Sequence, residues 1–257
     1  MEIIDTHTHL YLDQFDHDFD DMILRSFQRG IKKFVFPSIS SKHNQRMIDT
    51  HKRYPENFFL MAGLHPVYVK ENFFDELNVV KENLKNHNCV AIGEIGLDKH
   101  WDVSFLKQQK IAFQSQIDIA IEEDLPIVIH CREAFDDIYE ILLKNKSEKL
   151  RGILHCFTGN LEEAKKIIDL NFKIGIGGVV TFKNGGIDKF LDQIHISNIV
   201  IETDSPYLSP APHRGKRNES SYITYVIDKL SEIYHLSKSE IISQTSFNAN
   251  EVFDFNN

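Results

Sequence analysis

The sequence predicts an α/β fold, a single-domain (β/α)8 TIM barrel over residues 1–257. Eight short runs rich in β-branched and aromatic residues recur at intervals of roughly 25 to 40 residues, which predicts strands. Their continuous apolar character is typical of strands covered on both faces. Helical patterns separate most of them, and 257 residues suit one large domain of this kind. A doubly wound open sheet is the competing fold.

The eight predicted strands share an apolar body. In chain order they are "EIIDTH", "KKFVFPSI", "FFLMAGLH", "CVAIGEIGL", "PIVIHC", "GILHCF", "FKIGIGG" and "NIVIETD". Since no Pro/Gly/Ser-rich linker or low-complexity segment interrupts the series, the sequence predicts one domain.

Helices are predicted between these strands by apolar residues at helical spacing. An apolar stripe over residues 19–27 stops at Gly30, and a second stripe covers residues 108–123. Two further helices should begin at capping boxes, in which a capping side chain is followed three residues later by Glu. These boxes are Asn160 with Glu163 and Ser237 with Glu240.

The composition narrows the class of protein. A hydrophobic content of 42% with 26% charged residues is that of a globular chain rather than a disordered one. A net charge of −9 argues against electrostatic binding of nucleic acid by the whole protein surface. The three cysteines cannot form a disulfide framework, and no apolar run reaches the length of a membrane span. Because the cysteines fit a reducing compartment, we expect a cytoplasmic protein that does not enter membranes. We also expect a monomer.

Polar residues able to bind metal recur at the predicted strand ends. In a parallel barrel these ends meet on one face, where such enzymes hold their catalytic residues. Any one of them could be an ordinary hydrogen-bonded residue, but coincidence at six strand ends favours a site. The residues are His7, His9, His65, Glu94, His130, His155, Glu202 and Asp204.

This set has too many ligands for one ion and suits two divalent ions, with Zn, Mn, Mg or Ni all compatible with nitrogen and oxygen donors. His7 and His9 with Asp204 would hold one ion. His130 and His155 would hold the other, and Glu94 would bridge the two. Cys131 and Cys156 follow ligand histidines, so strand alternation turns them away and predicts packing roles.

The sequence resembles the TatD family of metal-dependent deoxyribonucleases, a branch of the amidohydrolase-type barrels. The segments that carry the resemblance span nearly the whole chain in the family's order. They are "DTHTHL", "AGLHP", "AIGEIGLD", "PIVIHCREA", "GILHCFTG", "GGVVTFK" and "ETDSPYL". The resemblance implies metal binding by His7, His9, Glu94, His130, His155 and Asp204. One departure is Ser220, where the family's basic loop usually has proline, and we expect it to soften that loop.

Family membership implies hydrolysis of phosphodiester bonds in DNA, and the predicted site is suited to it. Asp204 could accept the proton of the attacking water, with Glu202 as the substitute acceptor. His65 lies outside the predicted ligand set and could bind the phosphate or protonate the leaving oxygen. A compact barrel mouth favours single strands or chain ends, hence an exonuclease.

Basic residues near the strand ends are candidates for contacts with flanking phosphates. Arg132 follows His130 by two residues, and the cluster "HRGKR" after the eighth strand supplies Arg214, Lys216 and Arg217. Tyr207 or Phe157 could stack a base, although packing is the favoured role of each.

Two alternatives to a nuclease remain open from the sequence. A barrel of this type could hydrolyse an ester or amide instead, for example in an aminoacyl-tRNA. The chain could also bind metal without turnover, although the intact Asp204 argues against a degenerate site.

Overall fold

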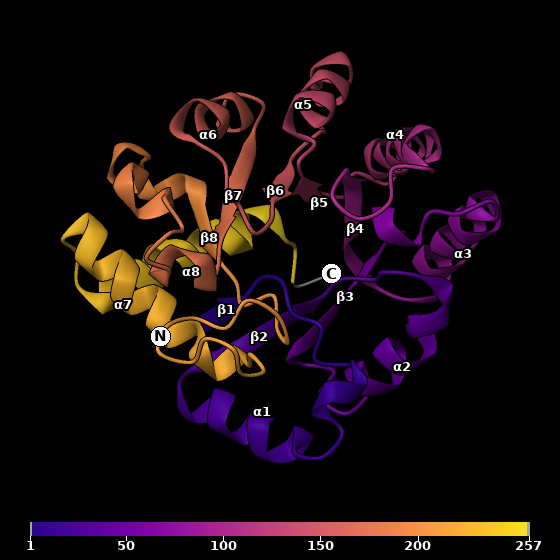
Figure 1. The fold of residues 1–257 in the computed structure, drawn as a ribbon. Helices are drawn as coiled ribbons and strands as arrows, with labels where there is room; N and C mark the ends of the chain where they lie inside the picture. The colour runs from indigo at the N-terminus through magenta and orange to yellow at the C-terminus, as the bar shows by residue number, and fades with distance from the viewer. Residues whose placement is uncertain (1, 256–257) are drawn as a thin grey trace.

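The computed structural model describes residues 2–255, which form one sheet of eight parallel strands in the order β1 to β8. Hydrogen bonding closes the sheet into a barrel, because the Thr6 N–H donates to the Ile201 carbonyl (3.2 Å) and Thr8 bridges Ser205. Figure 1 shows the strands inside a ring of helices, which confirms the predicted TIM barrel. The strands are β1 (Ile3–Asp5), β2 (Ile31–Phe36), β3 (Phe58–Ala62), β4 (Cys89–Asp98), β5 (Ile127–Arg132), β6 (Gly152–Leu154), β7 (Phe172–Ile176) and β8 (Ile199–Ile201).

Six α-helices connect the first seven strands, and two more follow β8. Both predicted capping boxes are present, at Asn160 on α6 and at Ser237 on α8. The two predicted stripes correspond to α1 and α4. The helices are α1 (Phe19–Gln28), α2 (Ser41–His51), α3 (Phe73–Asn86), α4 (Leu106–Glu123), α5 (Phe135–Lys144), α6 (Leu161–Ile168), α7 (Ile223–Tyr234) and α8 (Lys238–Val252).

The connection from β7 to β8 departs from strict strand–helix alternation. Four short 3-10 helices, within residues 178–198, replace an α-helix there. Two glycines, Gly185 and Gly186, interrupt this stretch, and glycine disfavours a continuous helix. The barrel is nevertheless complete, because α7 packs against these 3-10 segments and covers that side.

The core has two layers, as expected for a barrel whose strands alternate inward and outward. Outward residues such as Ile127 and Ile129 pack against the helices. Inward residues such as Val128, Ile153 and Val200 pack with Phe253, which follows α8. The end of α8 thus closes the barrel at the amino-terminal ends of the strands. The polar candidate site residues lie at the opposite end of the barrel, at the carboxyl-terminal ends of the strands.

The inward-facing residues of the barrel change from apolar to polar toward the carboxyl-terminal ends of the strands. Val128 is followed by His130, Ile153 by His155 and Val200 by Glu202, each two residues further along the chain, with His155 and Glu202 directly after the last residue of their strands. The polar residues therefore point in the same direction as the apolar residues beneath them.

A bulge in β4 turns Glu94 inward. Gly93 pairs with Val128 and Ile95 with Ile129, so Glu94 is an extra residue in the register. A side chain at Gly93 would lie 2.8 Å from the Met61 sulfur and from the Val128 Cβ. Glycine at this position therefore leaves room for the Met61 and Val128 side chains beside the bulge that presents Glu94.

Among residues 2–255, no helix is both long enough and apolar enough to cross a membrane.

Candidate metal centre

The Glu94 carboxylate lies at the centre of the polar end of the barrel, with imidazoles around both of its oxygens. The Nε2 atoms of His7 and His9 lie 3.2 and 3.7 Å from Oε2. The Nδ1 of His130 and the Nε2 of His155 both lie 2.9 Å from Oε1. The two oxygens of one buried carboxylate thus face two separate pairs of histidines.

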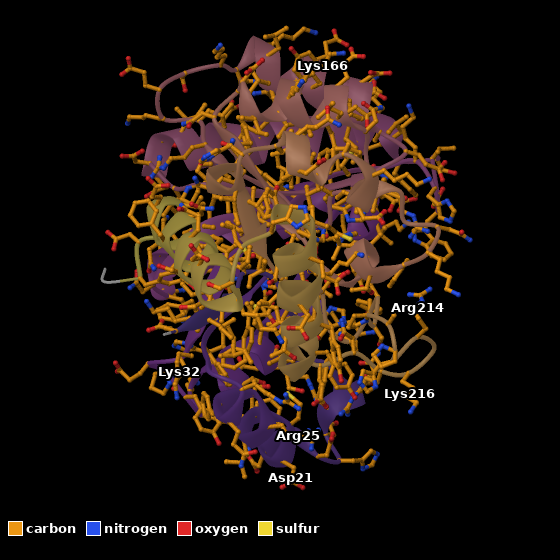
Figure 2. The ribbon with its side chains drawn as sticks, turned by 90° about the vertical axis from the view of Figure 1, so that its left-hand side faces the viewer. Asp21, Arg25, Lys32, Lys166, Arg214 and Lys216 are labelled. Carbon is orange, nitrogen blue, oxygen red and sulfur yellow. The ribbon has the colours of Figure 1, made fainter. Side chains whose placement is uncertain are left out.

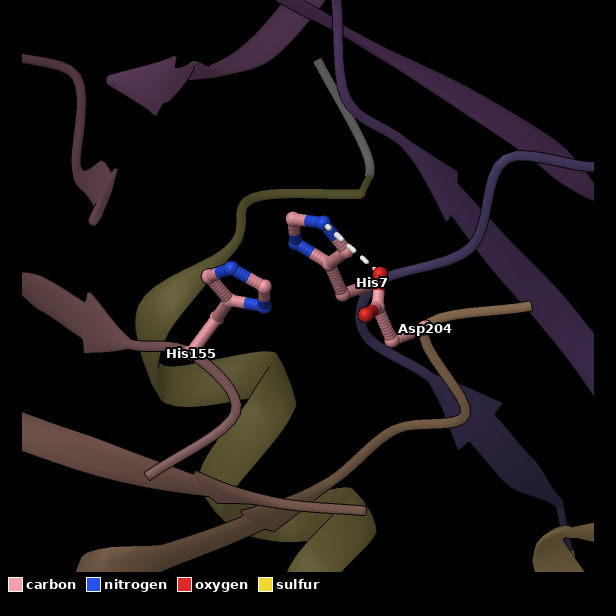
Figure 3. A group of neighbouring side chains, drawn as sticks. All are labelled: His7, His155 and Asp204. Carbon is pink, nitrogen blue, oxygen red and sulfur yellow. Dashed lines mark ion pairs between the residues drawn. The ribbon is translucent and has the colours of Figure 1, made fainter. Parts of the chain in front are cut away.

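Asp204 completes the side that contains His7 and His9. Its Oδ1 lies 3.4 Å from His9 Nε2 and 3.8 Å from His7 Nε2. Figure 3 shows the Asp204 carboxylate beside His7, while the rings of His7 and His155 stack with centroids 3.9 Å apart. The Asp204 backbone has a left-handed φ of 53° and donates its N–H to the His7 carbonyl (2.9 Å). This uncommon conformation aims the carboxylate at the histidines.

His65 lies closer to the centre than the sequence analysis expected. Its Nε2 is 3.2 Å from Glu94 Oε1, and it forms a group with Glu94 and His130 whose ligand atoms lie within 4.8 Å of one another. The other ring nitrogen, Nδ1, accepts the Val67 N–H at 3.1 Å. A neutral His65 must therefore carry its proton on Nε2, which makes this nitrogen a donor and not a free ligand.

Tyr11 fixes the opposite tautomer in His9. The Tyr11 hydroxyl donates its proton to the Pro37 carbonyl at 2.7 Å, so it can only accept from His9 Nδ1 at 3.1 Å. His9 Nδ1 therefore carries the proton, and the Nε2 lone pair faces Glu94 and Asp204. A lone pair directed at two carboxylates is repulsive unless a cation lies between them. Tyr11, two residues after His9, was not identified as a site residue from the sequence.

Asp98 is the second residue that the sequence analysis missed. Its Oδ2 accepts a hydrogen bond from His130 Nε2 at 2.9 Å, which leaves His130 Nδ1 directed at Glu94. A carboxylate behind a histidine is the usual way in which metal-binding imidazoles are oriented. The signal was present in the sequence, because Asp98 lies four residues beyond Glu94 on one face of the strand.

Glu202 lies behind His155 and not at the mouth of the barrel. It is fully buried, its Oε1 accepts the Cys156 N–H at 2.6 Å, and the same oxygen is 3.4 Å from His155 Nδ1. This geometry orients His155 so that its Nε2 faces Glu94. The structure therefore gives no direct route from Glu202 to a water at the mouth, contrary to the expectation of a substitute proton acceptor.

Electrostatics at the centre favour a cation. Burial would raise the pKa of Glu94, but the surrounding imidazoles hold it well below its usual range. Burial would lower the pKa of His155, but Glu94 and Glu202 together hold it well above its usual value. Asp204 is likewise kept ionised, since His9, His155 and His7 outweigh the effect of burial and lower its pKa. The carboxylates thus draw positive charge into the site.

The four predicted basic residues differ in their surroundings. Arg132 is exposed at the end of β5. Arg214 and Lys216 are exposed together on the loop after β8 (Figure 2), and Arg214 lies 3.5 Å above the Phe182 ring. Arg217 is instead paired with Asp18 through two hydrogen bonds of 2.6 and 2.8 Å. Arg217 thus fastens the basic loop to the segment before α1.

Ser220 does not soften this loop, contrary to the expectation from its departure from proline. It is fully buried, and its hydroxyl donates to Asp5 Oδ2 at 2.6 Å. Asp5 also accepts from the hydroxyl of Thr203 at 2.6 Å. The serine therefore ties the basic loop to β1 and to the segment after β8.

Of the two aromatic residues considered for base stacking, one is buried and one is exposed, and neither cysteine is suited to bind metal. Phe157 is buried in the core, whereas Tyr207 is 49% exposed with its ring 6.0 Å from that of His9. Cys131 packs against the core, and burial raises its pKa to about 11. Burial also raises the pKa of Cys156, so neither thiol is a ready ligand.

The family model described as TatD related DNase matches residues 4–254. The chain belongs to the TatD family. The Bacillus subtilis protein YabD, described as an uncharacterized metal-dependent hydrolase, is 38% identical over 255 residues, which cover 99% of this chain and all of the relative. The resemblance drawn from the sequence is thereby confirmed, and this TatD-family chain is a metal-dependent hydrolase.

Two further TatD-family relatives are informative. The Pantoea ananatis protein named 3'-5' ssDNA/RNA exonuclease TatD is 28% identical over 249 residues, 93% of this chain and 95% of that protein. The crystal structure of YjjV, a TatD homologue from Escherichia coli, superposes with a TM-score of 0.92 at 25% identity, covering 98% of both chains.

Proposed function

We propose that this TatD-family protein is an exonuclease that hydrolyses phosphodiester bonds of single-stranded DNA or of DNA chain ends, using two divalent ions. The observation that carries the proposal is the arrangement around Glu94, whose two oxygens face separate sets of imidazoles. A carboxylate of this kind is typical of a bridge between two ions. The name of the Pantoea relative supports the choice of nucleic acid as substrate.

The donor set fits two ions. On one side, the lone pair of His9 Nε2 faces the oxygens of Glu94 and Asp204, and none of these atoms carries a hydrogen that could form a hydrogen bond between them. On the other side, Asp98 accepts a hydrogen bond from the Nε2–H of His130, so His130 Nδ1 can supply a lone pair near Glu94 and His155. We assign His7, His9 and Asp204 to one ion, and His130 and His155 to the other, with Glu94 shared. Zn, Mn, Mg and Ni all accept these donors.

Bound ions would lower the pKa of a water and neutralise charge developing on the phosphoryl oxygens. The protein's own residues supply the proton transfers. Asp204 is ionised and its side chain is 14% exposed, so it can accept the proton of the attacking water. His65 keeps a proton on Nε2, and burial lowers its pKa, so it acts as a neutral donor. We assign His65 to the leaving or non-bridging oxygen of the phosphate.

Glu202 acts in this proposal as a positioning residue. Its carboxylate holds His155 from behind and never contacts substrate, because it is fully buried. The substrate's flanking phosphates would be held by Arg132, Arg214 and Lys216, which are exposed at the barrel mouth or on the loop after β8. Arg217 retains its ion pair with Asp18 and holds this loop in place.

The test is a substrate panel measured on one protein preparation. We expect metal-loaded protein to shorten single-stranded DNA from one end, chelator to abolish the reaction, and added divalent ion to restore it. Double-stranded DNA without free single-stranded ends and an aminoacyl-tRNA ester serve as comparison substrates. Hydrolysis of the ester with no release of nucleotides would refute the nuclease and favour an esterase on the same scaffold.

A further inference from the structure

Trp101 is an exposed aromatic residue on the rim that surrounds the metal centre. It is the only tryptophan of the chain, and 67% of its surface is exposed. It follows β4 by three residues, on the loop that leads to α4. An indole is a large apolar surface whose burial is favourable, so its position at the mouth of a polar site calls for a partner.

The loop that presents Trp101 is fixed to the metal centre by Asp98. The Oδ1 atom accepts the N–H groups of His100 at 2.9 Å and of Trp101 at 3.0 Å. The other oxygen of the same carboxylate accepts from His130 at 2.9 Å. One buried side chain thus connects a proposed metal ligand to the backbone of the exposed indole, and this holds the platform in a defined place.

A cation lies beside this platform. The Arg132 guanidinium carbon is 5.3 Å from the centre of the Trp101 ring. Arg132 pairs in register with Asp98 and lies two residues beyond His130, about 7 Å along the strand. Within residues 2–255 Arg132 has no carboxylate partner, whereas the acidic neighbours Glu133 and Asp102 are paired with His100 and Lys70. The local surface therefore offers an aromatic face and an unpaired positive charge.

We propose that Trp101 and Arg132 form a subsite that stacks one unpaired base of the nucleotide next to the scissile phosphate. This inference rests on the proposed function and specifies its substrate. The indole covers the face of the base, and Arg132 contacts the adjoining phosphate. Stacking of this kind is tolerant of sequence, because every base has a π face. Bases within a duplex have both faces covered, so the subsite selects single strands.

The single tryptophan provides a direct test, since its fluorescence reports only this position. The probe is oligothymidylate with phosphorothioate linkages, which resist hydrolysis, added to the metal-loaded full-length protein. We expect saturable quenching by this probe and none by an abasic strand with the same linkages. Trp101→Ala, followed by anisotropy of a labelled probe, should lower affinity about 5- to 150-fold, whereas Trp101→Phe should retain most of it.

The matched control is Phe74→Ala, which removes another exposed aromatic residue (62%) from α3. It should leave affinity unchanged. Equal quenching by the abasic strand, or unchanged affinity of Trp101→Ala, would overturn the subsite. Trp101-dependent dimers in sedimentation, with oligonucleotide affinity unaltered, would overturn it in favour of a contact between copies.

Hydrolysis of unmodified single-stranded DNA, measured on the same protein preparations, separates the subsite proposal from the nuclease proposal. Base-dependent quenching without release of nucleotides would support the subsite and reject the nuclease. Release of nucleotides without quenching would support the nuclease and reject the subsite.

Discussion

Replacing Asp98 by asparagine should weaken one metal site selectively. The Asp98 carboxylate accepts three hydrogen bonds, one from His130 and two from the backbone N–H groups of His100 and Trp101. Asparagine has one acceptor oxygen in place of two. If that oxygen keeps the backbone bonds, the amide NH2 faces His130 Nε2 and favours the tautomer protonated on Nδ1. The Nδ1 lone pair that faces Glu94 is then lost.

The expected size of this effect follows from the kind of bond that is lost. Removal of a carboxylate that orients a metal-binding histidine typically costs 10- to 100-fold in metal affinity, or about 1.4 to 2.7 kcal/mol. Because His7 and His9 do not contact Asp98, the second ion should bind with nearly unchanged affinity. Competitive titration of the apo-protein against a chromophoric chelator resolves the two binding steps.

Asp102→Asn is the matched control, because Asp102 lies on the same loop and pairs with the exposed Lys70 at 3.2 Å, away from the histidines. It should bind both ions as the parent protein does. If Asp98→Asn also binds both ions with parental affinity, the assignment of Asp98 to orienting His130 is wrong. A parallel loss of both ions with an intact fold would also contradict it, since only one ligand contacts Asp98.

The other predictions concern the proton acceptor, the basic loop and acid stability. Asp204→Asn should keep its bound metal but lower turnover on the order of a hundredfold. His7→Ala should instead bind less metal, as measured by elemental analysis. Near-normal turnover of Asp204→Asn would exclude Asp204 as the base. Neutralising Arg214 and Lys216 should flatten the slope of log affinity against log salt by about 1.4, at about 0.7 per phosphate contact. An unchanged slope would show that neither residue contacts a phosphate of the substrate. Hydrogen bonds from Arg217 lower the pKa of Asp18 to about 2, so this carboxylate stabilises the fold above about pH 4 and less as pH falls through 2. Asp18→Asn should therefore cost about 1 kcal/mol of unfolding free energy at pH 7 in urea titrations, after solvent screening, and the difference should shrink toward pH 2.

Most of the fold could be predicted because its signals are local. Each of the eight strands is a short run dominated by apolar residues, and the capping boxes at Asn160 and Ser237 begin helices as expected. The link from β7 to β8 could not be predicted in detail. Its apolar residues pack in short 3-10 turns, whose spacing resembles that of a helix.

The candidate site was predictable to the extent that strand ends converge in a barrel. That rule brings Glu94 and the histidines together without any further information. It says nothing about which ring nitrogen carries a proton, because that depends on partners such as Tyr11 and Asp98. The same limitation applies to Arg217, whose ion pair with Asp18 joins residues 199 positions apart in the sequence.

Anomalous diffraction from metal-loaded crystals tests the central claim most directly, since it gives the number, identity and place of the ions together. The account predicts two peaks, one among His7, His9 and Asp204 and one beside His130 and His155, with Glu94 between them. A single peak, or peaks away from Glu94 in protein that hydrolyses DNA, would contradict it.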